Sequence, residues 1–157
     1  MQLKLPFDTS QPISGEATIA IDKPAKDVFA FIADHFFENY PRWAPDVVEL
    51  QPLDTAEVAV GNKAKQVRDD NGTLVESIFQ FTGYNPYLDF RFEGLTAPYR
   101  HSYVLTEVEQ PPQTHLTFRF ELQELDVFMR PFQKLIRIAI EEGAETTVSS
   151  IKELLSN

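Results

Sequence analysis

The sequence contains no cysteine among its 157 residues, and this absence removes several kinds of chemistry. Disulfide bonds, thiolate zinc sites and cysteine nucleophiles are all excluded. The sequence also lacks a run of about eighteen apolar residues and the basic-then-apolar start that is typical of a signal peptide. We therefore expect a cytoplasmic protein with no stable insertion into a membrane.

Motifs for common cofactors and nucleophiles are missing as well. There is no GxSxG elbow, no P-loop and no GxGxxG turn. The histidines His35, His101 and His115 lie far apart, and none belongs to a two-histidine motif. We expect no cofactor and no metal site.

Positive charge is scarce, because the chain has 14 Lys and Arg residues but 24 Asp and Glu residues, which gives a formal net charge of −10. Such a surface repels phosphate backbones and anionic lipid headgroups, so nucleic acid is not an expected partner. Arg130, Lys134 and Arg137 are the basic residues that share one expected helix face, and a solvated stripe is the simpler interpretation of them. The sequence leaves the oligomeric state open.

Aromatic residues are abundant, with 13 Phe, 5 Tyr and 1 Trp, and most fall in segments that have strand-like patterns. The chain length favours one domain with a substantial core. Residues 1–15 include Pro6, Pro12 and Gly15, and we expect them to form an extended lead-in. Residues 16–157 are then the single folded domain.

The order of the expected elements follows from periodicity and proline positions. Alternation predicts a strand over residues 16–22, and Asp22-Lys23-Pro24 predicts the start of a short helix. Pro41 and Pro45 predict a sharp turn after it. Short connections favour an antiparallel meander of six more strands, over residues 47–53, 62–69, 73–82, 87–94, 100–108 and 114–123.

Asn71-Gly72 is the strongest hairpin signal in the chain. A two-residue turn there pairs Arg68 with Val75 and Gln66 with Ser77, and it turns all four side chains inward. The strand over residues 99–106 offers two competing faces, and we choose the one with Tyr99, His101, Tyr103 and Leu105 as inward. Alternation elsewhere predicts these inward residues: Phe79, Phe81, Leu88, Phe90, Phe92, Phe118 and Phe120.

The last thirty or so residues predict one long amphipathic helix that begins near Asp126. Its apolar face runs from Phe128 and Phe132 through Leu135 to Leu154. The middle of that face carries small residues instead of Leu or Phe, namely Ala139, Gly143, Thr146, Thr147 and Ser150. Either the helix packs closely on the sheet with Gly143 as a kink, or it forms one wall of a cavity.

A seven-stranded antiparallel sheet has one apolar face to cover, and only the terminal helix is long enough, so the sheet must curl around it. Residues 19–29 (IAIDKPAKDVF) and 40–45 (YPRWAP) resemble the polyketide cyclase/dehydratase-like branch of the START/Bet v 1 (SRPBCC) superfamily. The resemblance covers nearly the whole chain from about Glu16. It implies an α+β helix-grip fold, with two short helices after the first strand and a hydrophobic cavity between the sheet and the long helix.

The binding hypothesis places a lipid, isoprenoid, polyketide or aromatic ring compound in this cavity. Gln66, Arg68, Ser77 and His101 would orient its polar end. Trp43 can guard the mouth of the cavity or pin the helix turn to the sheet. The expected ligand-binding residues are Trp43, Gln66, Ser77, Phe79, Phe81, Phe90, Phe92, Phe118, Phe120, Phe132 and Gly143.

Two further classes of function stay open. In a cyclase or dehydratase, His101 would move a proton while Arg68 or Tyr103 stabilises a developing enolate oxygen. The structural alternative for His101 is a buried histidine whose hydrogen bonds are satisfied by Tyr103 or a backbone carbonyl. A third class, action through another protein or a membrane quinone, predicts an exposed apolar patch near the cavity mouth.

Overall fold

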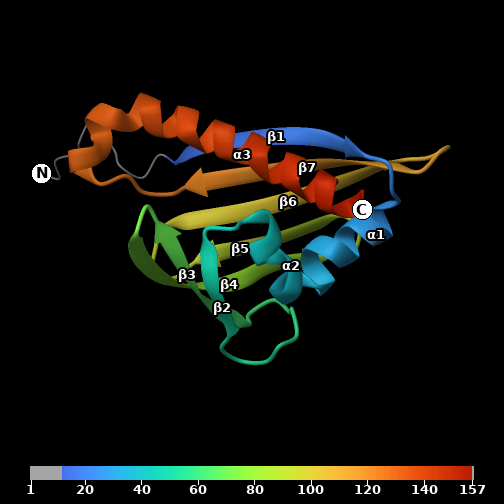
Figure 1. Cartoon of the computed structure of the whole chain (residues 1–157), viewed down its shortest axis with the longest axis horizontal. Helices are drawn as coiled ribbons and strands as arrows, with labels where there is room; N and C mark the ends of the chain where they lie inside the picture. The colour runs from blue at the N-terminus through green and yellow to red at the C-terminus, as the bar shows by residue number, and fades with distance from the viewer. Residues whose placement is uncertain (1–11, 157) are drawn as a thin grey trace, which may run out of the picture.

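The protein is described by a computed structural model that covers residues 12–156. Its centre is one seven-stranded antiparallel sheet with the order β1-β7-β6-β5-β4-β3-β2 (Figure 1). Consecutive strands pair from β2 to β7, and β1 lies beside β7. The strands are β1 (Ile13–Ile21), β2 (Val47–Pro52), β3 (Lys63–Asp70), β4 (Thr73–Asn85), β5 (Asp89–Gly94), β6 (Tyr99–Val108) and β7 (Gln113–Leu122).

Helical segments lie on one face of this sheet. They are α1 (Ala25–Phe29), a π-helical turn η1 (Ala30–Asp34), α2 (Phe36–Trp43), a 3-10 segment η2 (Val127–Phe132) and the long α3 (Gln133–Leu155). Figure 1 shows α3 running obliquely over the sheet, with its last turns near α1. This arrangement confirms the predicted helix-grip fold. No helix within residues 12–156 combines the length and the apolar character that crossing a membrane requires.

The first strand begins at Ile13 instead of Glu16. It pairs with β7 from the start, as Ile13 lies opposite Leu122. Residues 1–11 of the expected lead-in lie outside the described residues.

The hairpin register predicted from Asn71-Gly72 is confirmed, with Arg68 opposite Val75 and Gln66 opposite Ser77. Asn71 has a φ of 53° and Gly72 a φ of 94°, which is the backbone conformation that a two-residue hairpin turn needs. The Gly72 N–H donates to Asp69 Oδ1 at 2.7 Å. Asp69 therefore serves the turn.

The choice of inward face for β6 is also confirmed, because Tyr99, His101, Tyr103 and Leu105 are all buried. An aromatic core lies beside them around Phe36. The ring centroid of Phe36 lies 4.7 Å from that of Tyr40 and 5.3 to 6.0 Å from those of Phe79, Phe81, Phe90 and Phe92. The short helix α2, and not α3, thus covers the β4 and β5 part of the sheet.

The prediction that the whole apolar face of the terminal helix is buried is wrong. Burial begins only at Ala144 and continues through Val148, Ile151 and Leu155. Phe128 is 82% exposed and Leu135 is 65% exposed, because α3 packs on β1 and β7 with its later turns while η2 and the first turns project past that contact (Figure 1).

The helix is also interrupted at its start. Asp126 does cap a helical segment, since its carboxylate accepts the Phe128 N–H at 2.9 Å. That segment is the 3-10 turn η2, and it contains Pro131, which has no N–H and whose ring disfavours a continuous α-helix. The α-helix proper therefore begins at Gln133.

Three local expectations need correction. The sharp turn expected from Pro41 and Pro45 lies at Pro45-Asp46, because α2 continues through Pro41 to Trp43, anchored by the buried Tyr40 and Trp43 side chains. Leu88 is exposed because it precedes β5, directly after Tyr87 with its φ of 69°. Val75 is exposed because it lies near the hairpin end of the sheet, where it finds too few neighbours to cover it.

Two isoleucines on α3 give a direct test of this uneven burial. Ile151 is fully buried, whereas Ile138 is 43% exposed. We expect Ile151→Val to lower the free energy of unfolding by about 0.5 to 1.5 kcal/mol, and Ile138→Val to change it by less than about 0.5 kcal/mol. Urea unfolding followed by circular dichroism measures both. Equal losses in the two variants would contradict the assignment of support to the later turns alone.

Candidate functional site

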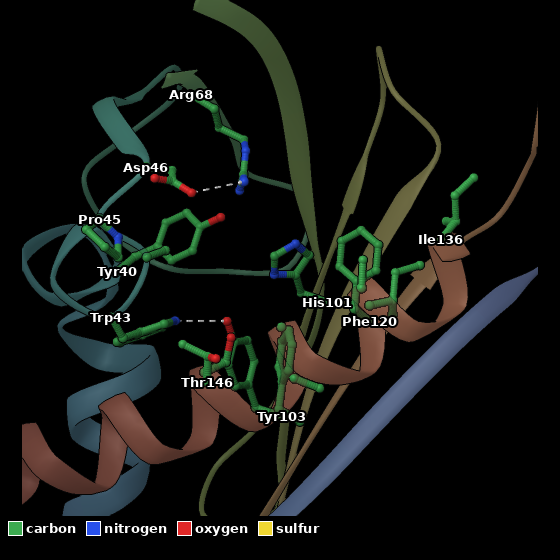
Figure 2. A pocket seen from close by; sticks show the side chains of 17 residues that line it. Tyr40, Trp43, Pro45, Asp46, Arg68, His101, Tyr103, Phe120, Ile136 and Thr146 are labelled. Atoms are coloured by element: carbon green, nitrogen blue, oxygen red, sulfur yellow. Dashed lines mark hydrogen bonds and ion pairs between the residues drawn. The ribbon is translucent and has the colours of Figure 1, made fainter. Parts of the chain in front are cut away.

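A pocket of about 530 Å³ lies beneath α3, between the helix, the end of α2 and the inner face of β3, β6 and β7 (Figure 2). Phe118 and Phe120 on β7 form part of its apolar wall, and Ile136 and Ile140 on α3 face it from the other side. Side chains therefore do not fill the space between the first turns of α3 and the sheet.

The small residues of α3 line this space. Ala139, Gly143, Thr146 and Thr147 all belong to the pocket wall, as does the buried Ala144. A Cβ atom added at Gly143 would meet no atom within 4 Å. At Gly143 the structure therefore agrees with the cavity interpretation, whereas the neighbouring Ile140 and Glu141 pack closely on Gly15 of β1.

The polar side chains of the pocket gather where β3, β6 and the end of α2 meet. The Trp43 Nε1–H donates to Tyr103 Oη at 3.3 Å, which ties α2 to β6. Trp43 is buried and lines the pocket, so it both pins the helix and contributes to the wall. Burial raises the pKa of Tyr103 well above its ordinary value, so its hydroxyl stays protonated.

Arg68 brings a positive charge to the mouth of the pocket. Its Nη2 lies 3.9 Å from Asp46 Oδ2, and its Nε lies 3.6 Å from Asp70 Oδ1. The side chain is partly open to solvent, so these ion pairs hold its position more than they stabilise the fold. Figure 2 shows the guanidinium extending toward the side of the pocket that holds Tyr40 and His101.

His101 is the most unusual group in the site. Its ring stacks on Phe92 with centroids 4.4 Å apart, and Phe120 contacts it edge-on at 5.2 Å. Its Nδ1 is buried and has no hydrogen-bond partner. Figure 2 shows the imidazole facing the space between Tyr40 and Tyr103. The Nδ1 atom is enclosed by protein atoms, so a ligand would meet His101 through the part of the ring that lines the pocket.

The imidazole of His101 is neutral near physiological pH. Burial lowers its pKa from 6.5 to about 3, and the positive charge of Arg68 adds a smaller contribution in the same direction. A neutral imidazole has one donor and one acceptor nitrogen. His101 can therefore make hydrogen bonds to a bound molecule, while its weak basicity makes it a poor proton acceptor.

Gln66 and Ser77 do not line the pocket, although both were expected to orient a ligand. Tyr40 Oη donates to Gln66 Oε1 at 2.9 Å, and Gln66 Nε2 donates to Tyr99 Oη at 2.9 Å. Ser77 Oγ lies 2.8 Å from Tyr99 Oη. These groups satisfy one another's hydrogen bonds, and they fix the hydroxyls of Tyr40 and Tyr99.

The other predicted site residues divide into two groups. Seven of them line the pocket: Trp43, Arg68, His101, Tyr103, Phe118, Phe120 and Gly143. The remaining five do not line it. Four are fully buried in the core around Phe36, namely Phe79, Phe81, Phe90 and Phe92, and the fifth, Phe132, is half exposed on η2. The direction of these phenylalanines on their strands was correctly predicted. Which of them line the pocket depends on where the helices cover the sheet.

Several pocket residues were missed at the sequence level. Ile136 and Ile140 follow the same helical spacing as Ala139 and Gly143, so they could have been assigned to the cavity with them. No pattern in the sequence marks Asp46 as a pocket residue. It reaches Arg68 because β2 pairs with β3, with Val47 opposite Arg68.

The family profile described as polyketide cyclase / dehydrase and lipid transport matches residues 12–156. The chain belongs to this family. The match spans the sheet, the pocket and α3, and agrees with the resemblance seen in residues 19–29 and 40–45. No curated protein sequence matches the chain.

Solved structures share the fold at low sequence identity. The Zhui aromatase/cyclase from Streptomyces sp. R1128 is 11% identical, with a TM-score of 0.72 over 91% of this chain and 93% of that one. The protein TTHA0849 from Thermus thermophilus is 14% identical, with a TM-score of 0.68 over 89% and 94%. Ara h 8.0201 is 12% identical, with a TM-score of 0.67 over 94% and 100%. At these identities the likeness establishes the fold alone.

Proposed function

We propose that this protein binds an apolar small molecule with one polar end in the pocket beneath α3. The observation that carries the proposal is an apolar-walled space of about 530 Å³ whose lining also includes His101, Tyr103 and Arg68. Ligand pockets commonly measure about 300 to 1,000 Å³ and combine apolar walls with a few polar groups.

The walls suggest how such a molecule lies. Its apolar body packs against Phe118, Phe120 and Ile140, and its polar end approaches His101 and Arg68. Arg68 favours an anionic or strongly accepting group, because it is the cation at the mouth. A lipid, isoprenoid, polyketide or aromatic ring compound with an oxygen at one end meets these requirements.

A cyclase or dehydratase is the alternative function, and the same pocket would be its site. Arg68 would stabilise a developing enolate oxygen, and Tyr103 or neutral His101 would donate a hydrogen bond to it. The Zhui protein is an aromatase/cyclase of the same fold, which favours this alternative. The lowered pKa of His101 weighs against it as the group that moves the proton, so binding is the function we favour.

The partner and the compartment follow from composition. The net charge of −10 favours a small apolar ligand over nucleic acid. The cytoplasm is the proposed location, since a chain without cysteine depends on no oxidising compartment for its stability.

Gly143 offers a test of the pocket with a matched control. We expect Gly143→Leu to fill the open space and weaken binding of anilinonaphthalene sulfonate by about tenfold or more, while Gly143→Ala retains binding. Both variants should melt no lower than the parent, because glycine inside a helix costs about 1 kcal/mol relative to alanine. Fluorescence titration and thermal melting measure the two effects.

Either of two results would count against the pocket. Unfolding by Gly143→Leu would mean that the helix packs closely there, and unchanged dye affinity in the folded variant would place the binding site elsewhere. Native mass spectrometry of freshly purified protein then asks which small molecule the parent carries. A mass increment present in the parent and lost in Gly143→Leu identifies the natural ligand.

A further inference from the structure

The start of the long helix carries a group of exposed, large apolar side chains. We define the α3 tip as residues 127–138, which comprise η2 and the first turns of α3. Its large apolar side chains include one of the most exposed in the chain, Phe128 at 82%. Single exposed apolar residues are ordinary, but a cluster of this kind marks an interaction surface. The exposed members are Val127, Phe128, Met129, Phe132, Leu135 and Ile138.

The charge of the α3 tip is opposite to that of the rest of the chain. Residues 127–138 contain Arg130, Lys134 and Arg137 and no acidic residue, which gives +3. Because the whole chain has a net charge of −10, the other residues sum to −13. Lys134 and Arg137 are exposed on the helix. Negative charge returns with the exposed Glu141 and Glu142, so the basic apolar surface ends at Ile138.

The α3 tip adjoins the pocket and lies at an end of the molecule. Ile136 within the tip and Ala139 directly after it both line the pocket. Figure 1 shows this start of α3 at the opposite end of the molecule from α1 and the C terminus. The apolar and basic residues of the tip therefore lie at one end of the molecule.

We propose that the α3 tip docks on the surface of a membrane that contains anionic phospholipids. Phe128 and Leu135 would enter the headgroup region, and Lys134 and Arg137 would contact lipid phosphates. Exposed apolar side chains interleaved with Lys and Arg are the chemistry of interfacial helices. Each cation near an anionic leaflet adds to the attraction.

The charge pattern favours a membrane over a second copy of this chain. A symmetric pair joined through the tip would bring two copies of the exposed Lys134 and Arg137 together, and like charges at an interface repel. The docking proposal does not rest on the proposed ligand. Vesicle binding and dye binding are measured separately, so one can fail while the other holds.

The test uses the full chain and vesicles of phosphatidylcholine, either alone or mixed equally with phosphatidylserine. We expect flotation with the mixed vesicles, less flotation with phosphatidylcholine alone, and release by salt. The double variant Lys134→Glu with Arg137→Glu should weaken partitioning by about 30-fold or more. Its charge-matched control is Lys26→Glu with Lys152→Glu, which changes exposed lysines away from the tip. This control should weaken partitioning to the vesicles far less.

An apolar pair of variants completes the design. Phe128→Ser should reduce flotation, whereas Leu74→Ser, which removes an exposed leucine from the β4 hairpin, should not. A parent protein that does not float with the mixed vesicles overturns the proposal, as does equal loss in the tip variants and their controls. A parent dimer that Phe128→Ser converts to a monomer also overturns it, because a second copy then covers the surface.

Discussion

Replacing Phe36 with alanine should lower the free energy of unfolding by about 3 to 5 kcal/mol. The ring is fully buried, stacks on Tyr40 at 4.7 Å and meets Phe81, Phe90 and Phe92 edge-on at 5.3 to 5.5 Å. Aromatic side chains cannot easily collapse into the space that it leaves, so the loss includes a cavity as well as transfer to water.

Phe128→Ala is the matched control for this variant. Phe128 is 82% exposed, so its removal should change the free energy of unfolding by less than about 0.5 kcal/mol. Chemical denaturation measures both variants at one temperature. A loss below about 1 kcal/mol for Phe36→Ala would show that α2 does not organise the core.

Replacing His101 with phenylalanine should protect the protein from acid. The parent His101 has a pKa of about 3 when folded and 6.5 when unfolded. The unfolded chain therefore binds a proton first, so parent stability is intact above pH 6.5 and falls as pH drops toward about 3. The difference in pKa corresponds to a loss on the order of 5 kcal/mol in the acid limit, which the variant would not suffer.

The measurement is urea unfolding of the parent and His101→Phe at several pH values. The advantage of the variant should grow as pH falls below 6.5. His115→Phe is the control, since it makes the same change at an exposed histidine. Parallel profiles for the parent and His101→Phe would show that His101 titrates normally in the fold.

The same variant separates the roles of His101 near neutral pH. Removing an unpartnered buried nitrogen should not lower stability there, because no hydrogen bond within the protein is lost. A clear loss of stability would instead indicate a histidine whose hydrogen bonds support the core. A ligand oriented by His101 should bind more weakly to the variant by about 0.5 to 1.5 kcal/mol.

The sequence predicted those parts of the fold that depend on local geometry. Asn71-Gly72 determined the β3–β4 register because this turn allows few alternatives, and that register placed Arg68 on the inner face. The small residues around Gly143 left close packing and a cavity both open, and the open space beside Gly143 in the structure favours the cavity. His101 was placed inward because its strand alternates with Tyr99 and Tyr103.

The remaining features depend on which helix covers each part of the inner face of the sheet. Strand alternation gives Phe92 and Phe118 the same inward direction, but α2 covers the first and the pocket opens above the second. The exposed tip could not be predicted because its spacing is that of a buried helix face, and only the place where α3 leaves β1 and β7 shows otherwise. The pairing of Asp46 with Arg68 required the β2–β3 register.

The uneven support of α3 has a consequence for rates. Its later turns share the buried core, and Ile140 and Glu141 pack against Gly15 of β1, whereas Ile136 is the only partly buried residue among residues 133–139. Local opening of residues 133–139 disrupts few apolar contacts, so its free energy lies far below that of global unfolding. A molecule in the pocket can then enter and leave while the sheet stays intact. Residence time would be determined by the first turns of α3, independently of the melting temperature.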